Sequence, residues 1–113
     1  MTKPELTVQK QVEFYNNHDL EGFISTYHKD AELINLTDNS VILKGTENFH
    51  KRYKERFEVQ KARAEIVNRM VIGNMVIDHE HIKKANSSEI MKAVAIYRVK
   101  DGLIEKVWFI FEQ

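Results

Sequence analysis

The stretch that decides the fold is residues 8–36, VQKQVEFYNNHDLEGFISTYHKDAELINL. Its second half has the i, i+3, i+4, i+7 spacing of a helix with one buried face, at Leu20, Phe23, Ile24 and Tyr27. Asp19 comes directly before this helix and can accept hydrogen bonds from the free amides of its first turn. After Asp30 the helical spacing ends, and residues 32–36 alternate as a strand does. The stretch therefore predicts two short helices leading into a strand, an arrangement that closes one end of a curved sheet around a pocket.

The composition indicates one soluble globular domain, residues 1–113. The chain is 42% hydrophobic and 30% charged, and its 17 basic and 17 acidic residues give a net charge of +0. We therefore expect neither nucleic acid nor a membrane as a partner, and we interpret the basic side chains of residues 51–63 as a solvated face. The absence of cysteine excludes disulfides and thiol chemistry. Because no apolar run approaches the roughly 20 residues of a membrane span and residues 1–5 are no signal peptide, we expect a cytoplasmic protein.

Turn-forming residues divide the rest of the chain into short elements. Residues 37–40 and the pairs Gly73-Asn74 and Asp101-Gly102 each predict a turn between strands. Thr46 is the expected N-cap of a third helix. The predicted helices cover residues 4–15, 20–27 and 46 to about 60, and the predicted strands cover residues 31–36, 41–44, 62–72, 75–84, 89–99 and 103–112. Helices first and strands last predict an α+β fold with a largely antiparallel sheet.

Four motifs follow one another in the order and spacing of a known superfamily. They are Tyr15-Asn16-x-x-Asp19-Leu20-x-x-Phe23, Tyr27-x-x-Asp30-Ala31, Gly45-Thr46-x-x-Phe49, and Tyr97-Arg98-Val99-x-Asp101-Gly102-x-Ile104 with Trp108 beyond it. In these motifs the chain resembles the nuclear transport factor 2-like superfamily over essentially its whole length. The resemblance implies a cone-shaped α+β fold, also called cystatin-like, in which three helices of the N-terminal half pack on a curved, mixed but mostly antiparallel sheet. It implies no single activity, because this fold serves isomerases, cyclases, dehydratases and binding modules.

The same resemblance shows that the superfamily's usual catalytic residues are missing. Ketosteroid isomerases have an oxyanion-hole tyrosine where this chain has Gln11, a base aspartate where it has Asn35, and a protonated aspartate where it has Ala95. SnoaL-like polyketide cyclases have an aspartate after the last-strand tryptophan, and here Trp108 is followed by Phe109. An asparagine cannot act as a base, although Gln11 and Asn35 can still hydrogen-bond a carbonyl or hydroxyl group.

Asp78 and Glu80 are the sharpest catalytic candidates. Because side chains alternate along a strand, both point to one face, and the resemblance turns that face toward the interior of the cone. In an apolar pocket, desolvation and mutual repulsion raise the pKa of at least one carboxyl group, which suits acid–base chemistry. The alternative is that one of the carboxylates pairs with Arg69 or Arg98 and only stabilises the sheet.

The helix stripes and the strand alternation converge on one interior pocket. Its aromatic residues belong either to the core alone or to a pocket wall continuous with the core. The expected lining is Gln11, Tyr15, Tyr27, Asn35, Tyr53, Phe57, Asp78, Glu80, Tyr97 and Phe109. Two functions stay open. The first is a small-molecule-binding pocket protein without the superfamily's catalytic aspartates. The second is an isomerase, cyclase or dehydratase that acts on a small apolar carbonyl compound, with Asp78 or Glu80 as acid or base.

The sequence His79-Glu80-His81 raises the question of a metal site. Two histidines at i and i+2 can chelate a metal only with a third ligand. His28 and His50 are available, but no spacing brings them close, and the resemblance places His79 and His81 outside the pocket. We therefore expect neither a metal nor a cofactor.

The outer face of the last strands is the expected interface of a homodimer. Residues 103–112 are apolar on both faces, and such a strand is buried on both sides. In a domain this small the helices cover only one side, so the outer side needs a partner. The alternative is that a helix or the C-terminal residues fold back over it. The predicted interface residues are Val94, Ile96, Trp108 and Ile110.

Overall fold

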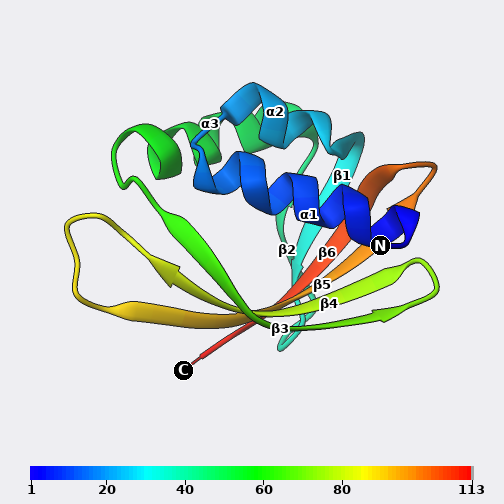
Figure 1. Ribbon diagram of the computed structural model, residues 1–113. Helices are drawn as coiled ribbons and strands as arrows, with labels where there is room; N and C mark the ends of the chain where they lie inside the picture. Colours follow the sequence, from blue (N-terminus) through cyan, green and yellow to red (C-terminus); the bar gives the residue numbers. More distant parts are fainter. Residues whose placement is uncertain (113) are drawn as a thin grey trace.

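The structure is a computed structural model that describes residues 1–112, and it contains a helical layer and a sheet layer (Figure 1). The helices are α1 (Lys3–Asn16), α2 (Leu20–Ser25) and α3 (Thr46–Glu58). The strands are β1 (Tyr27–Asn35), β2 (Ser40–Lys44), β3 (Arg63–Ile72), β4 (Met75–Lys83), β5 (Ile90–Lys100) and β6 (Leu103–Phe111). All three helices lie on the same side of the sheet, which leaves its other side uncovered by any helix of the described residues.

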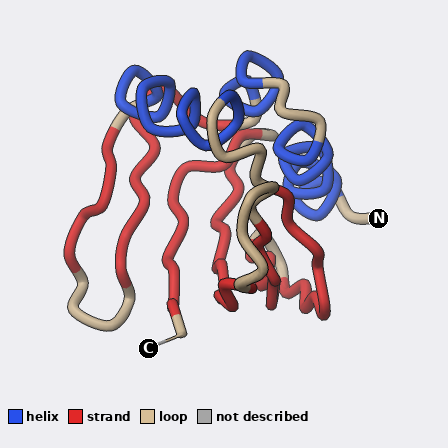
Figure 2. The backbone as a smooth tube through the Cα atoms, turned by 90° about the vertical axis from the view of Figure 1, so that its left-hand side faces the viewer, coloured by secondary structure: helices blue, strands red, loops and turns tan. Residues whose placement is uncertain are grey.

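The six strands form one mixed sheet in the order β2-β1-β6-β5-β4-β3. Every neighbouring pair is antiparallel except β1 and β6, which run parallel with Ile34 opposite Trp108. The sheet does not close into a barrel, because β2 and β3 are its edges. Figure 2 shows the strands running down from the helices, as expected for a cone that is open at one end. The predicted α+β cone is confirmed.

Local hydrogen bonds set the helix ends, and two expected boundaries were wrong. Asp19 caps α2 as predicted, because its Oδ1 accepts from the amide of Gly22 at 2.9 Å. The helix ends at Ser25 rather than residue 27, because the carbonyl of Thr26 accepts from the amide of Ile104 at 2.8 Å and draws the chain into the sheet. Gly45 rather than Thr46 is the N-cap of α3, at a φ of 84° that favours glycine.

The core lies between the helices and the concave face of the sheet. Along β4 the even-numbered side chains from Val76 to Ile82 are buried, and the odd-numbered ones are less so. Asp78 and Glu80 therefore point inward, and His79 and His81 point outward, as the expected register has it. A ring of aromatic side chains fills the space under the helices, including Phe23, which is fully buried.

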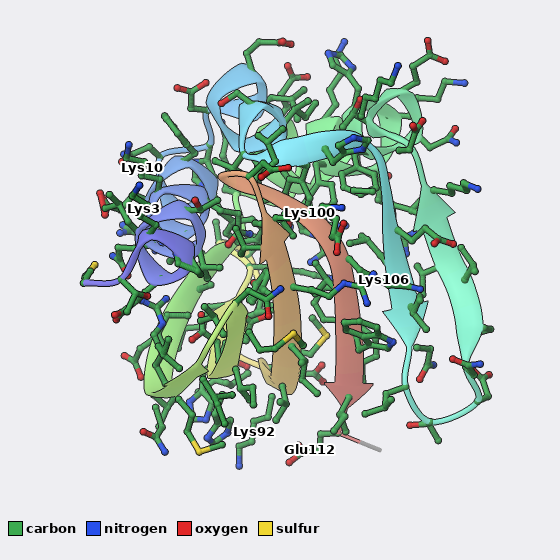
Figure 3. The ribbon with its side chains drawn as sticks, turned by 90° about the vertical axis from the view of Figure 1, so that its right-hand side faces the viewer. Lys3, Lys10, Lys92, Lys100, Lys106 and Glu112 are labelled. Carbon is green, nitrogen blue, oxygen red and sulfur yellow. The ribbon has the colours of Figure 1, made fainter. Side chains whose placement is uncertain are left out.

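The outer face of β5 and β6 carries the side chains of the predicted interface. Val94, Ile96 and Trp108 are half-buried, and Ile110 is 40% exposed. Arg98 and Lys106 lie over the ring of Trp108, each about 5.4 Å from its centroid. Figure 3 shows Lys106 reaching from β6 toward β1, where its Nζ is 3.8 Å from a carboxylate oxygen of Glu32. Within residues 1–112, no helix has the length and apolar character needed to cross a membrane.

Candidate functional site

A cavity of about 250 Å³ lies between the helices and the concave face of the sheet. Its walls are mostly aromatic and aliphatic, with a few polar groups. Of the expected lining residues, the structure brings together Gln11, Tyr15, Tyr27, Tyr53, Glu80, Tyr97 and Phe109. Among those that the sequence did not point to are Leu33, Ile42, Arg52, Arg56, Met91 and Phe111. The cavity is thus a mostly apolar space with a few polar groups contributed by α1, α3, β1, β4 and β5.

Three expected lining residues lie elsewhere. The Oδ1 atom of Asn35 accepts a hydrogen bond from the amide of Thr37 at 3.0 Å, so this side chain shapes the turn after β1. Phe57 is buried behind the wall, with its ring edge-on to that of Tyr15 at 5.1 Å between centroids. Asp78 is completely buried, but it does not reach the cavity. The prediction that these three residues line the pocket was wrong.

Asp78 forms a bidentate ion pair with Arg69. The Nε and Nη2 atoms of Arg69 lie 2.7 and 2.9 Å from the two carboxylate oxygens of Asp78. Arg69 also donates to the Oε1 atom of Gln9 at 2.9 Å, and its Nη1 lies 3.7 Å from a carboxylate oxygen of Glu5. This is the structural alternative that the sequence left open, and both oxygens of Asp78 are bound to Arg69 rather than free for acid–base chemistry.

A bulge in β3 makes this ion pair possible. Ile66 lies opposite Glu80, but Asn68 lies opposite His79 and Arg69 opposite Asp78. Without the extra residue in β3, regular alternation would place Asn68 opposite Asp78. The bulge therefore delivers the guanidinium to the inward face beside Asp78, two residues from Glu80.

Glu80 is buried in the cavity wall without a partner. It is 6% exposed, and the described residues offer its carboxyl group neither a hydrogen bond nor an ion pair. Burial raises its pKa to about 8, with a further contribution from the negative charge of Asp78, and the positive charge of Arg56 opposes the shift. At pH 7 the protonated form therefore predominates, so Glu80 presents an O–H donor to the cavity.

The other polar groups of the cavity are neutral hydroxyls and an amide. Burial raises the pKa of the hydroxyls of Tyr15, Tyr27, Tyr53 and Tyr97, so all four stay protonated at physiological pH. The Oε1 atom of Gln11 is buried and lacks a hydrogen-bond partner within residues 1–112. A polar ligand group that entered the cavity would find both donors and an unoccupied acceptor.

Two arginines are the functional residues that sequence reasoning missed. Arg52 and Arg56 lie one turn apart on α3, and both line the cavity. We had interpreted the basic residues of this helix as a solvated face, but Arg56 follows Phe49 by seven positions and Tyr53 by three. That spacing places it on the edge of the buried stripe and was the available signal.

His79 and His81 form no part of this cavity. They lie on the outer side of β4, with ring centroids 5.4 Å apart. Among residues 1–112, no group of three or more histidine, aspartate or glutamate side chains is arranged to hold a metal.

The fold, with a cavity between its helices and the concave face of its sheet, is that of the nuclear transport factor 2-like class of protein. The SnoaL-like domain family matches residues 8–107, so the chain belongs to that family. No curated protein matches the sequence.

Solved structures share this fold at low sequence identity. An uncharacterised cystatin-fold protein from Novosphingobium aromaticivorans has a TM-score of 0.82 and 24% identity, over 96% of this chain and 97% of the other. A proposed ketosteroid isomerase from Kribbella flavida has a TM-score of 0.84 and 14% identity, over 98% and 78% of the two chains. An epoxide hydrolase from M. tuberculosis has a TM-score of 0.80 and 14% identity, over 97% and 83%. At these identities the similarity establishes the fold alone.

Proposed function

We propose that the cavity binds a small, mostly apolar molecule carrying a carbonyl or hydroxyl oxygen, and that Glu80 donates a hydrogen bond to that oxygen. The observation that carries this proposal is the carboxyl group of Glu80, which is buried without a partner in an otherwise apolar wall. Glu80 lines the cavity, so a carboxyl group that meets no protein partner there is available to hydrogen-bond a ligand. A ligand oxygen would provide the missing partner.

The size and lining of the cavity support a small ligand. Its volume of about 250 Å³ lies below the range of roughly 300–1,000 Å³ that is usual for drug-sized ligands. Phe109, Leu33 and Met91 offer apolar contacts, and the tyrosine hydroxyls and Gln11 add a few fixed polar groups. Mostly apolar walls with a few convergent polar groups are typical of specific small-molecule sites.

A second function, acid–base catalysis by Glu80, is favoured by its pKa of about 8. A group with a pKa near the working pH can both take up and return a proton. In an isomerisation, the ionised form would remove a proton from the carbon next to a carbonyl group and return it to another carbon. A tyrosine hydroxyl such as that of Tyr53 or Tyr97 would donate to the oxygen on which negative charge develops. Asp78 is excluded from this role because its charge is held by Arg69.

The experiment compares ligand binding to the wild type and to Glu80→Gln. A thermal-shift screen of small ketones, enones and alcohols identifies binders, and titration calorimetry then measures their affinity at pH 7. We expect Glu80→Gln to lower the affinity for a carbonyl ligand about tenfold, in line with a loss of about 1.4 kcal/mol for one hydrogen bond. Glu65→Gln is the matched control, because Glu65 lies in the same sheet but is exposed and outside the cavity.

Binding that is equal in the wild type and in Glu80→Gln would contradict the proposed role of Glu80. Deuterium exchange in deuterated water, at the carbon next to the carbonyl group of a bound ketone, separates the enzyme from the binding protein. Exchange into the ligand in the wild type but not in Glu80→Gln would establish the catalytic function. Tight binding without deuterium exchange at pH 7 or pH 9 would show that the protein binds the ligand without catalysing the reaction.

We also propose that a second copy of the chain covers the outer face of the sheet. Ile96 lies between Ile77 and Trp108 across the strands, and the helices are all on the opposite side. The amide of Glu112 donates to the carbonyl of Lys92, so the chain continues along β5 up to this point and does not fold back over the face. Light scattering at micromolar concentration should give the mass of a dimer, and Trp108→Glu should give monomers or insoluble protein. A monomeric wild type would contradict this proposal.

A further inference from the structure

Three arginines of this chain are half-buried, and one of them has no carboxylate. Arg69 is paired with Asp78, and Arg98 is paired with Glu105. The guanidinium group of Arg56 forms no ion pair with a carboxylate among the described residues. Within residues 1–112 its guanidinium group makes one hydrogen bond, from Nη1 to the hydroxyl of Tyr15 at 3.4 Å. A guanidinium group in a partly dehydrated wall needs acceptors, and a tyrosine hydroxyl at that distance is a weak one.

A second arginine, one helical turn away on α3, adds to the unpaired positive charge of Arg56. Arg52 precedes Arg56 by four positions, and two like charges at this spacing destabilise an isolated helix by about 0.2–0.5 kcal/mol. Both side chains line the cavity, and the described residues give neither an ion pair. The two guanidinium groups thus form a cationic rim on the α3 side of the cavity.

The groups that face this rim from the other elements do not neutralise it. Tyr15 on α1 and Tyr53 on α3 are neutral because burial raises the pKa of both hydroxyls. Glu80 on β4 is the carboxyl group whose charge is felt by Arg56, and it is mostly protonated at pH 7. The cavity therefore combines apolar walls, neutral hydrogen-bond donors and an uncompensated positive charge.

We propose that the ligand of this cavity is a small apolar monocarboxylate whose carboxylate is held by Arg56, with Arg52 as a second, more exposed contact. This inference rests on the proposed function and names the class of molecule that the same cavity binds. A carboxylate matches the planar fork of a guanidinium group, with two parallel N–H donors to its two oxygens. The apolar part of the acid would lie against Phe109, Leu33 and Met91.

A monoanion fits this rim better than a phosphate group does. Arg52 is exposed, so its charge is largely screened by solvent, and Arg56 alone contributes a strongly directed contact. The cavity has no glycine-rich loop, and among its lining residues Arg52 and Arg56 are the only cations. The half-buried guanidinium group of Arg56 can therefore balance the single negative charge of a carboxylate.

The test uses pairs of probes that differ only in charge. Phenylacetate, 3-phenylpropanoate and octanoate are each compared with the corresponding primary amide, which has nearly the same shape without the charge. Titration calorimetry at pH 7 and low ionic strength gives the ratio of the two affinities. We expect at least one acid to bind the wild type ten times more tightly than its amide. Arg56→Gln should reduce this ratio to near one.

Two further variants keep the test decisive. Arg63→Gln is the matched control, because Arg63 is an exposed arginine outside this cavity, and it should retain the full ratio. Arg56→Lys keeps the charge but loses the fork, and it should retain a ratio of about two to four. If Arg56→Gln does not fold, Arg56→Lys by itself shows whether the preference for acids depends on the guanidinium group.

The outcomes separate this inference from the proposed function. If amides bind the wild type as tightly as acids, the carboxylate inference is overturned and the binding function stands. The same holds if Arg56→Gln and Arg56→Lys keep the wild-type preference for acids. If no acid, amide, ketone or alcohol binds the wild type, the binding function fails, and this inference fails with it.

Discussion

Two neighbouring positions on the inward face of β4 place a carboxyl group in opposite environments. Asp78 is fully buried and meets a two-pronged guanidinium group, which is itself held by Gln9 and Glu5 of α1. Glu80 is almost as buried, but it faces an apolar cavity and meets no partner. The first arrangement ties α1 to the edge of the sheet, and the second leaves a polar group free for a ligand. Burial alone therefore does not mark a functional carboxylate, whereas burial without a partner does.

Substitutions of Asp78 and Glu80 should have very different effects on the free energy of unfolding. Asp78→Asn leaves the charge of Arg69 half-buried without its counter-ion, and we expect it to lower the free energy of unfolding by about 3–5 kcal/mol. Glu80→Gln removes no ion pair and should leave that free energy unchanged or raise it at pH 6, because the variant lacks the group that favours its charged form only in the unfolded chain. Urea denaturation followed by circular dichroism measures both. Equal losses in the two variants would contradict the contrast.

The next effect is the pH dependence of stability. A pKa near 8 in the folded state, against an ordinary glutamate value of about 4.3 in the unfolded chain, means that the folded state binds more protons between these values. Stability is therefore favoured at low pH and falls as the pH rises from about 5 to 8. We expect Glu80 alone to contribute a slope approaching 1.4 kcal/mol per pH unit, as an order of magnitude.

Glu80→Gln provides the comparison for this pH dependence. The variant lacks the titrating group, so its stability should exceed that of the wild type by an amount that grows from pH 5 to pH 8. Urea midpoints at four pH values, with Glu65→Gln as control, give this difference. A constant difference would show that Glu80 ionises normally in the folded protein.

An exposed ion pair should contribute much less to stability than the buried pair of Arg69 and Asp78. Arg98 and Glu105 pair on the outer side of the sheet, where their side chains are 40% and 28% exposed. Glu105→Gln should cost about 0.2–1 kcal/mol, because solvent screens the pair and also receives the freed arginine. The same denaturation experiment measures it. A loss as large as that of Asp78→Asn would indicate that this pair is buried in the protein as it exists in solution, as it would be in a dimer.

Much of this architecture was predictable from the chain itself. The apolar spacing in residues 8–36 predicted the two helices and the strand, and the alternation of β4 correctly placed Asp78 and Glu80 on the inward face. The motifs from Tyr15 to Trp108 correctly predicted the superfamily. These signals are local and periodic, and sequence patterns report such features well.

The division of roles between the two carboxylates was not predictable. It depends on the bulge in β3, which shifts Arg69 by one residue and gives it to Asp78 rather than to solvent. Asn35 was assigned to the pocket by resemblance, but it precedes a run of turn formers and bonds to the amide of Thr37. Arg56 was expected to face solvent because charged side chains on a helix are usually exposed. The contacts of Arg69 and Arg56 join distant segments, which no single-strand or single-helix pattern contains, whereas the turn formers after Asn35 were a local signal.

The central claim is that Glu80 is a neutral carboxylic acid at pH 7, and its pKa tests this most directly. Side-chain carboxyl ¹³C signals followed by NMR from pH 4 to pH 10 report each glutamate separately, and the signal absent from Glu80→Gln identifies the residue. We expect a midpoint of about 8 for Glu80. A midpoint near the ordinary glutamate value of about 4.3 would contradict it, because Glu80 would then be an ionised carboxylate with no proton to donate at pH 7.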